Sequence, residues 1–224
     1  MLQNFSTKIR IAILDDHAVV RFGLSSRLAA ENDFDIVGVY ENGASLIAGL
    51  RINPADILAV DFSLGPADLD GVSLIRVLHI KFPESKILVV SSHYDAATVA
   101  LVLRVGALGF VGKDQSLSKV VSAIRKVASG EIYLDTEMAV KLAETSTQLA
   151  RTDGNEKLVN TAQLSIKEWE VIRCFLDGLT VSEIAEKFDR SPKTISTQKS
   201  MAYRKLGVTS DNGLFKIKHL LIDI

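Results

Sequence analysis

The fold class of this chain is decided by residues 10–17, which read RIAILDDH. After Arg10, residues 11–14 form a short apolar run, which is typical of a strand buried on both faces. The run ends in two carboxylates, and a helical pattern follows over residues 19–30. A strand that passes directly into a helix is the first part of a unit that joins parallel strands.

The same alternation recurs four more times before residue 131. The predicted strands are Arg10–Leu14, Ile36–Tyr40, Ile57–Val60, Ile87–Val90 and Gly109–Val111. The predicted helices are Val19–Ala30, Ala44–Ile52, Val72–Lys81, Ala96–Val105 and Leu117–Ala128. Five such units predict an α/β domain whose parallel sheet has helices on both faces. In such sheets, ligands bind at the edge formed by the carboxyl ends of the strands.

Composition excludes several classes of protein. The single cysteine, Cys174, excludes an intramolecular disulfide and a zinc site with several cysteines, and four histidines disfavour a histidine metal site. Residues 1–7 show no signal-peptide pattern. The most apolar stretch, residues 96–112, is interrupted by Arg104 and is shorter than the roughly 20 residues that cross a bilayer. We expect a soluble, cytoplasmic protein with no membrane partner.

The second part of the chain predicts a smaller all-α domain. Residues 132–160 form a weakly patterned linker, with a short helix at Glu137–Leu142 and a turn at 152–155. Four helices without strands follow. Capping boxes at Ser165 and Thr180 open the first two. Ser191-Pro192 opens a longer helix to about Leu206, and the last is Asn212–Leu221.

Charge is unevenly distributed along the chain. Residues 1–150 carry 14 basic and 17 acidic residues, whereas residues 151–224 carry 12 and 10. Between positions 187 and 205, six basic side chains face Asp189 as the one acidic residue. Two helices joined by a short turn, the second of them basic, predict a DNA-binding helix-turn-helix. For an isolated helix, an amphipathic helix with a solvated basic face is the alternative.

Reactive side chains follow the predicted strands. Asp15 and Asp16 follow the first strand, Asp61 the third, Ser91 the fourth and Lys113 the fifth. Because these ends meet at one edge of a parallel sheet, we expect the side chains to converge. Clustered carboxylates with open positions suit Mg²⁺, and a carboxylate beside it can attack a phosphoryl group. Each residue alone has a simpler explanation as a turn or a helix cap.

Several motifs together resemble a known family. LDDH (14–17), VDFSL (60–64), DG (70–71), VS (90–91) and GFVGK (109–113) resemble the receiver domain of two-component response regulators, a flavodoxin-like (βα)5 fold. Residues 164–208 resemble the DNA-binding domain of the NarL/LuxR (FixJ) class. KTISTQK (193–199) is most similar to RcsB-like regulators. The resemblance implies a receiver domain over 7–131, a linker over 132–160 and a LuxR-type helix-turn-helix domain over 161–224.

The resemblance also implies roles for the residues at the strand ends. Asp61 would accept the phosphoryl group, Ser91 and Phe110 would form a switch pair, and Lys113 would contact the phosphoryl group. The implied Mg²⁺ ligands are Asp15, Asp16, Asp61 and the backbone carbonyl of Ser63.

The implied function is that of a response regulator transcription factor. A sensor histidine kinase, a phosphotransfer protein or a small phosphodonor would phosphorylate Asp61, and phosphorylation would switch dimerisation and binding to double-stranded promoter DNA. A homodimer is expected, and auxiliary regulators are further candidate partners, with which the chain would form heterodimers. The chain would be no enzyme beyond its own phosphoryl transfer and dephosphorylation.

The third helix of the C-terminal domain would enter the major groove. By family position, Ser196, Thr197 and Ser200 would reach base edges, while basic side chains would meet phosphates. The full set of implied DNA contacts is Lys193, Thr194, Ser196, Thr197, Lys199, Ser200, Arg204 and Lys205, with Thr180 and Ser182 on the preceding helix.

The chain departs from the usual receiver pattern at three places. Gly65-Pro66 stands in a long loop after Asp61, Asp114 follows Lys113 where many receivers have proline, and Phe110 lacks the hydroxyl of a switch tyrosine. Two other hypotheses remain open. One is a regulator that acts through partner proteins without phosphorylation. The other is a Mg²⁺-dependent phosphatase of the haloacid dehalogenase type, which needs an acid where this chain has Ser63.

Overall fold

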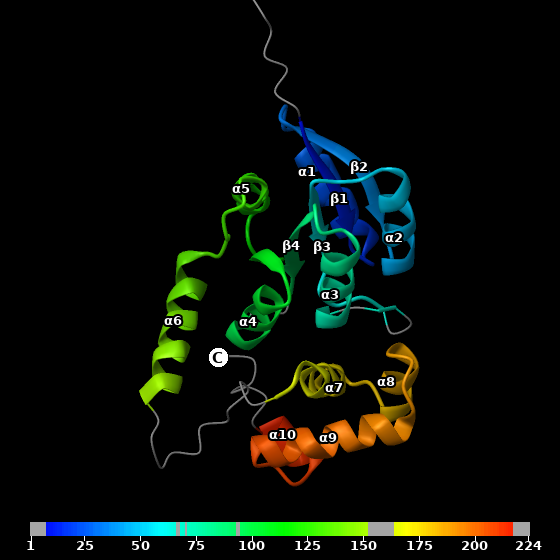
Figure 1. The fold of residues 1–224 in the computed structure, drawn as a ribbon, viewed down its shortest axis with the longest axis vertical. Coiled ribbons are helices and arrows are strands. Elements are labelled where there is room, and N and C mark those ends of the chain that lie inside the picture. Colours follow the sequence, from blue (N-terminus) through cyan, green and yellow to red (C-terminus); the bar gives the residue numbers. More distant parts are fainter. Residues whose placement is uncertain (1–7, 66–67, 70, 93–94, 152–163, 217–224) are drawn as a thin grey trace, which may run out of the picture. The chain divides into compact units, whose positions relative to one another are not determined.

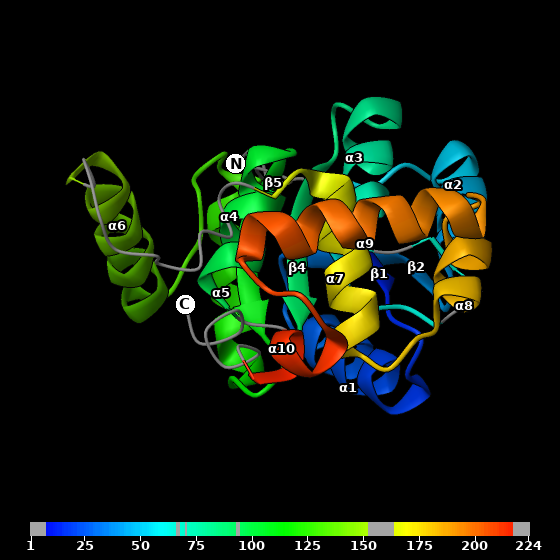
Figure 2. The same ribbon diagram turned by 90° about the horizontal axis from the view of Figure 1, so that it is seen from below.

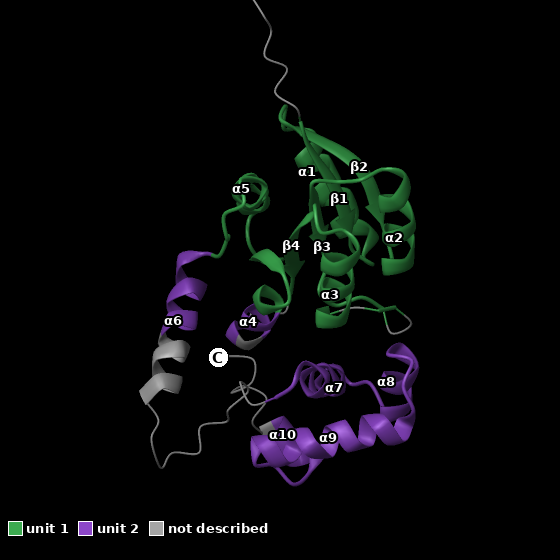
Figure 3. Ribbon diagram, in the orientation of Figure 1, with its two compact units in different colours: residues 1–92, 102–134 green, residues 93–101, 135–224 purple. Residues whose placement is uncertain are grey.

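The computed structural model describes residues 8–65, 68–69, 71–92, 95–151 and 164–216. Figure 3 shows that the chain divides into two compact units. The first comprises Met1–Ser92 and Val102–Leu134, and the second comprises His93–Leu101 and Asp135–Ile224. No helix among the described residues is long and apolar enough to span a bilayer.

A five-stranded sheet forms the centre of the first unit (Figure 1). Its strands are β1 (Ile9–Leu14), β2 (Phe34–Tyr40), β3 (Ile57–Val60), β4 (Lys86–Ser91) and β5 (Ala107–Gly112). They lie in the order β2-β1-β3-β4-β5, and all four neighbouring pairs are parallel. The predicted parallel α/β fold is therefore confirmed.

Five helices alternate with these strands, as the sequence pattern predicts. They are α1 (Ala18–Ala29), α2 (Gly43–Ile52), α3 (Gly71–Lys81), α4 (Ala96–Arg104) and α5 (Leu117–Ala128). Helices α1 and α5 pack on one face of the sheet, and α2 and α3 lie on the other (Figure 2). Because successive side chains of a strand point to opposite faces, alternate residues such as Ile11 and Ile13 join the core under α1 and α5.

The register of the sheet sets the positions of the strand-end residues. Leu14 pairs with Val60, so Asp15 and Asp61 leave two adjacent strands at the same level. The Asp61 amide donates to the Leu14 carbonyl at 2.8 Å. At the other side of the site, the amide of Lys113 donates to the Ser91 carbonyl at 2.8 Å. The carboxyl ends of four strands therefore form one edge.

The C-terminal part of the second unit contains the helices α7 (Ile166–Leu176), α8 (Val181–Lys187), α9 (Pro192–Leu206) and α10 (Asp211–Lys216). The predicted capping boxes are present, with Ser165 and Thr180 each accepting from the backbone amide three residues on. Gly207 ends α9 with φ of +70°, a conformation that glycine adopts without steric cost. The last helix was predicted to reach Leu221, and the part beyond 216 lies outside the described residues.

The core of these helices is apolar and closely packed. Ile172, Ile184, Ile195 and Ala202 are all fully buried. On α9, Ala202 faces inward, whereas its neighbour Met201 is 43 % exposed.

The helix predicted at Glu137–Leu142 is longer in the structure, where α6 spans Thr136–Arg151. Asp135 caps it, because its Oδ1 accepts the Met138 amide at 2.8 Å. Residues 136–151 contain no glycine or proline and are rich in good helix formers, which allows the helix to continue through a polar stretch. The predicted turn at 152–155 lies outside the described residues.

Replacing Ser165 by alanine is expected to lower the free energy of unfolding of the helical domain by about 1 kcal/mol, because the first turn of α7 loses its side-chain cap. Thermal unfolding of the full chain measures the effect. Ser182→Ala is the matched control, since Ser182 is exposed and lies inside α8. Equal destabilisation by both substitutions would contradict the capping role.

Candidate functional site

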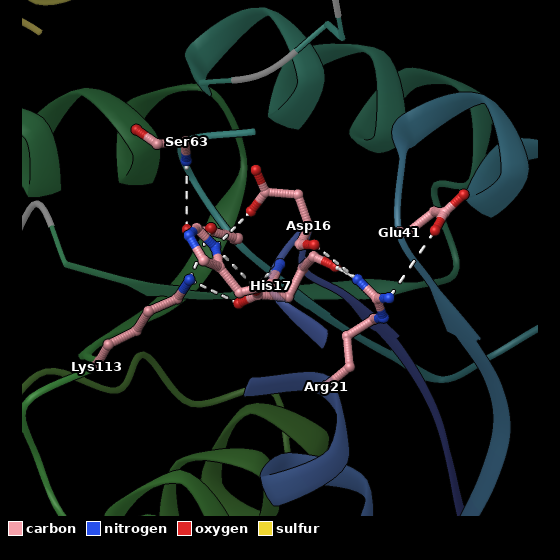
Figure 4. A network of polar contacts seen from close by, with 8 residues as sticks. Asp16, His17, Arg21, Glu41, Ser63 and Lys113 are labelled. Atoms are coloured by element: carbon pink, nitrogen blue, oxygen red, sulfur yellow. Dashed lines mark hydrogen bonds and ion pairs between the residues drawn. The ribbon is translucent and has the colours of Figure 1, made fainter. Parts of the chain in front are cut away.

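Three strand ends meet at one ammonium group. The Lys113 Nζ lies 2.6 Å from Asp15 Oδ2 and 2.7 Å from Asp61 Oδ2. Both carboxylates are nearly inaccessible, at 1 % and 3 % exposure. The ends of β1, β3 and β5 thus place two buried acids around one base, and Figure 4 shows Lys113 within this network of polar contacts.

Burial and pairing act in opposite directions on this cluster. Burial raises the pKa of Asp61, although the hydrogen bond and charge of Lys113 oppose that rise, and the charge of Asp15 adds to it. Burial by itself would lower the pKa of Lys113, but its hydrogen bonds to Asp15 and Asp61 outweigh burial and raise it. Lys113 therefore stays charged at neutral pH, and Asp61 ionises less readily than an exposed aspartate.

Asp16 and two neighbours extend the cluster outward (Figure 4). The Nδ1 of His17, an exposed residue, lies 2.6 Å from Asp16 Oδ1. Arg21 donates to the backbone carbonyls of Asp15 and Asp16 at 2.7 and 2.9 Å. The structure thereby shows that Arg21 holds the backbone of both acids, a contact that no motif or spacing in the sequence indicates.

The donor set fits a hard divalent cation. Four residues, Asp15, Asp16, His17 and Asp61, each offer one atom that could bind a metal ion. These four atoms all lie within 4.8 Å of one another. Ser63 lies beside them, since its amide donates to Asp61 Oδ1 at 3.3 Å. Because three of the four groups are carboxylates, a site of this kind favours oxygen-seeking ions.

Ser91 and Phe110 are both fully buried. Ser91 is the last residue of β4 and pairs with Gly112, next to Lys113. Phe110 lies two residues before Gly112 in β5 and pairs with Val89. The structure thus places Ser91 at the level of the acidic cluster and Phe110 deeper in the sheet.

Helix α9 exposes most of the predicted DNA contacts. The exposed members are Lys193, Thr194, Ser196, Thr197, Ser200, Arg204 and Lys205. Thr180 and Ser182 are exposed at the start of α8, but the Thr180 hydroxyl is engaged with Glu183 in the capping box.

Lys199 differs from the other basic residues of α9. Its side chain is 15 % exposed, and its Nζ lies 2.8 Å from Asp211 Oδ1. The same Nζ lies 3.4 Å from the centre of the Phe175 ring, a favourable cation–π arrangement. Lys199 thus links α9 to α7 and α10, and sequence reasoning missed its partner Asp211.

Lys205 is also paired, although it remains partly exposed. Its Nζ lies 2.7 Å from Glu168 Oε2, in a pair where the lysine is 34 % and the glutamate 4 % exposed. Burial would raise the pKa of Glu168, but Lys205 and the Ser165 cap lower it overall. Among the basic residues of α9 that are predicted to contact DNA, Lys193 and Arg204 are therefore the two exposed ones without an ion pair to another described residue.

Asp61→Asn is expected to raise the melting temperature at pH 7 with metal chelated. The pKa of Asp61 is raised in the folded state, so its ionisation costs stability above that pKa. The cost vanishes as pH falls below the ordinary value of 3.8, so the difference from wild type should shrink on acidification. A variant that is less stable at pH 7, or a difference that grows on acidification, would contradict this.

Both halves of the chain match known families. A response regulator receiver domain matches residues 11–125. A domain described as bacterial regulatory proteins, luxR family, matches residues 162–217.

Two related proteins are similar to this chain over almost its whole length. Oxygen regulatory protein NreC of Staphylococcus carnosus is 30% identical over 217 residues, which cover 96% of this chain and 100% of the relative. Transcriptional regulatory protein RcsB of Salmonella typhi is 34% identical over 208 residues, which cover 92% of each chain.

Solved structures of RcsB from Salmonella typhimurium share the fold. One matches with a TM-score of 0.77 and 32% identity, covering 94% of this chain and 96% of the other. Another, of RcsB bound to a promoter in the presence of the phosphomimetic BeF3−, matches with a TM-score of 0.75 and 32% identity, covering 94% and 98%. With a receiver domain followed by a LuxR-type DNA-binding domain, the chain belongs to the response regulator transcription factors.

Proposed function

We propose that phosphorylation of Asp61 controls promoter binding by α9 in this response regulator. The observation that carries the proposal is the buried Asp61 carboxylate held 2.7 Å from Lys113, beside two further acids. An aspartate needs an adjacent positive charge to accept a phosphoryl group, because the product concentrates negative charge. This edge of the sheet supplies that charge.

The proposed reaction transfers one phosphoryl group from a donor to Asp61. An oxygen of the Asp61 carboxylate attacks the phosphorus of a phosphohistidine or a small acyl phosphate. A P–O bond forms to Asp61, and the P–N or P–O bond to the donor breaks, with its electron pair remaining on the departing imidazole or carboxylate. Lys113 then contacts a phosphoryl oxygen in place of the carboxylate oxygen that it holds in this structure. In this proposal, the chain's own phosphoryl transfer and dephosphorylation would be its only catalysis.

Mg²⁺ is the proposed cofactor, held by Asp15, Asp16, Asp61 and the backbone carbonyl of Ser63. When bound, it would neutralise charge on the phosphoryl oxygens. Arg21 and His17 would keep the acidic side chains and their backbone in place for it.

The switch pair is proposed to respond after transfer. The Ser91 hydroxyl would donate to a phosphoryl oxygen that was absent before. Phe110 is fully buried and has no hydroxyl, so its part in switching would rest on packing alone.

The proposed organisation has a receiver domain over 7–131, a connecting segment over 132–160 and a DNA-binding domain over 161–224. Phosphorylation would favour a homodimer that binds two half-sites of double-stranded DNA. A sensor histidine kinase or phosphotransfer protein would supply the phosphoryl group in the cytoplasm, and auxiliary regulators could replace one subunit.

The proposed DNA interface is the exposed face of α9. Ser196, Thr197 and Ser200 would read base edges in the major groove, and Lys193 and Arg204 would bind phosphates. Thr194, Lys205 and Ser182 would lie at the margin of this interface. Lys199 and Thr180 would contribute mainly through the contacts that they make within the domain.

Wild-type protein is expected to incorporate one phosphoryl group from radiolabelled acetyl phosphate in the presence of Mg²⁺, and Asp61→Asn is expected to incorporate none. Asp56→Asn is the matched control, because Asp56 is exposed and lies just before β3, at its opposite end. Scintillation counting of the isolated protein measures the label. Full labelling of the Asp61→Asn protein would refute the assignment.

Lys193→Gln and Lys199→Gln are expected to differ in the salt dependence of DNA binding. Each phosphate contact contributes about 0.9 to the slope of log K against log salt, so loss of Lys193 should reduce the slope by about that amount. Lys199 is held by Asp211, so its loss should leave the slope unchanged. Fluorescence anisotropy with a labelled random-sequence duplex measures both, and an equal reduction would show that Lys199 also binds phosphate.

A further inference from the structure

A short segment after α5 covers the outer edge of the sheet. β5 is the last strand in the sheet order, so one of its edges has no partner strand among the described residues. Tyr133 occupies that edge. Its amide donates to the Leu108 carbonyl at 2.9 Å, and its carbonyl accepts from the Phe110 amide at 3.1 Å. Residues 132–134, called the edge segment here, are thereby bonded to both sides of Gly109.

The contact between the edge segment and β5 is close as well as hydrogen-bonded. Gly109 and Tyr133 form a parallel bridge. A Cβ atom at Gly109 would lie 2.9 Å from Leu88 Cδ1, 3.0 Å from Val127 Cγ2 and 3.2 Å from the Cβ of Tyr133, all tighter than ordinary van der Waals contact. Glycine at this position therefore lets the edge segment lie directly against the strand.

The strand under the edge segment leads directly to the acidic cluster. Lys113 follows β5, and its ammonium holds both Asp15 and Asp61. A phosphoryl group on Asp61 would change the atom that Lys113 contacts, so phosphorylation would act on the end of β5 through this side chain. Phe110, whose amide bonds to the edge segment, lies three residues before Lys113 on the same strand.

The other end of the edge segment leads directly to α6. Leu134 is followed by Asp135, whose Oδ1 caps the helix through the Met138 amide and whose carbonyl accepts the Ala139 amide at 3.0 Å. Only Leu134 therefore separates the residue bonded to β5 from the residue that caps α6. A displacement of β5 acts on the first turn of this helix with little intervening chain to absorb it.

We propose that the edge segment transmits the state of the Asp61 site to α6 through the two hydrogen bonds between Tyr133 and β5. The inference rests on the proposed phosphorylation of Asp61, and it assigns the route of regulation. Tyr133 acts as a positioning residue through its backbone, and Gly109 permits the approach.

Hydrogen–deuterium exchange of the full chain, with and without beryllofluoride and Mg²⁺, tests the proposal. In wild type, exchange should change both in peptides around Asp61 and Lys113 and in the peptide covering 134–143. Tyr133→Pro removes the amide donor to Leu108. In this variant the response near Asp61 should persist, and the response of 134–143 should fall by more than half.

Two control variants and one further disruptive variant make the result specific. Tyr133→Phe keeps the ring and the amide and should respond like wild type. Ile132→Pro adds a proline at an exposed neighbour whose amide makes no hydrogen bond among the described residues, and it should also keep the response. Gly109→Ala is a second disruptive variant: its methyl group would crowd Tyr133 as well as Leu88 and Val127, and the response of 134–143 should fall. It provides the test if Tyr133→Pro does not fold.

Two outcomes would overturn the proposal. One is a full response of 134–143 in both Tyr133→Pro and Gly109→Ala. The other is a wild-type protein in which the Asp61 peptides respond but 134–143 does not. If the wild-type Asp61 peptides themselves fail to respond, the proposed function fails and this route fails with it, and that result is distinct from either of the other two.

Discussion

The candidate site depends on one interaction, the ammonium of Lys113 held between the carboxylates of Asp15 and Asp61. Two buried carboxylates repel each other in a medium of low polarity, and a single shared cation offsets that repulsion. Because loss of Lys113 would leave both buried carboxylates without a compensating charge, the three residues act as a unit. The interaction also joins the ends of three separate strands, and from this we infer that a chemical change at Asp61 acts on the end of β5.

The sheet register is what makes this interaction possible. Leu14 pairs with Val60, and strand order places β1 beside β3, so the two acids emerge side by side. The same sheet leaves the outer edge of β5 open to residues 132–134. One arrangement of strands therefore builds the reactive cluster and exposes the strand through which we infer that its state is transmitted to α6.

Short-range sequence patterns predicted most of the fold, whereas many side-chain contacts were beyond their reach. Strands, helices and caps depend on local periodicity and on residues such as Ser165 and Gly207, which the sequence displays directly. The convergence of Asp15, Asp61 and Lys113 followed from topology. The pairing of Lys199 with Asp211 and the bonding of Tyr133 to β5 could not be predicted, because they depend on tertiary packing and on backbone groups that every residue shares. The length of α6 was underestimated because polarity suggested a linker where helix propensity prevailed.

The central claim is that the state of Asp61 controls DNA binding by the second half of the chain. The most direct measurement is the affinity of the full-length protein for a duplex selected from a random pool by the phosphorylated protein, with and without beryllofluoride and Mg²⁺. The account predicts tighter binding with beryllofluoride in the wild type and no gain when Asp61 is replaced by alanine. Equal affinity in all four conditions would contradict it and would favour a regulator that acts independently of phosphorylation.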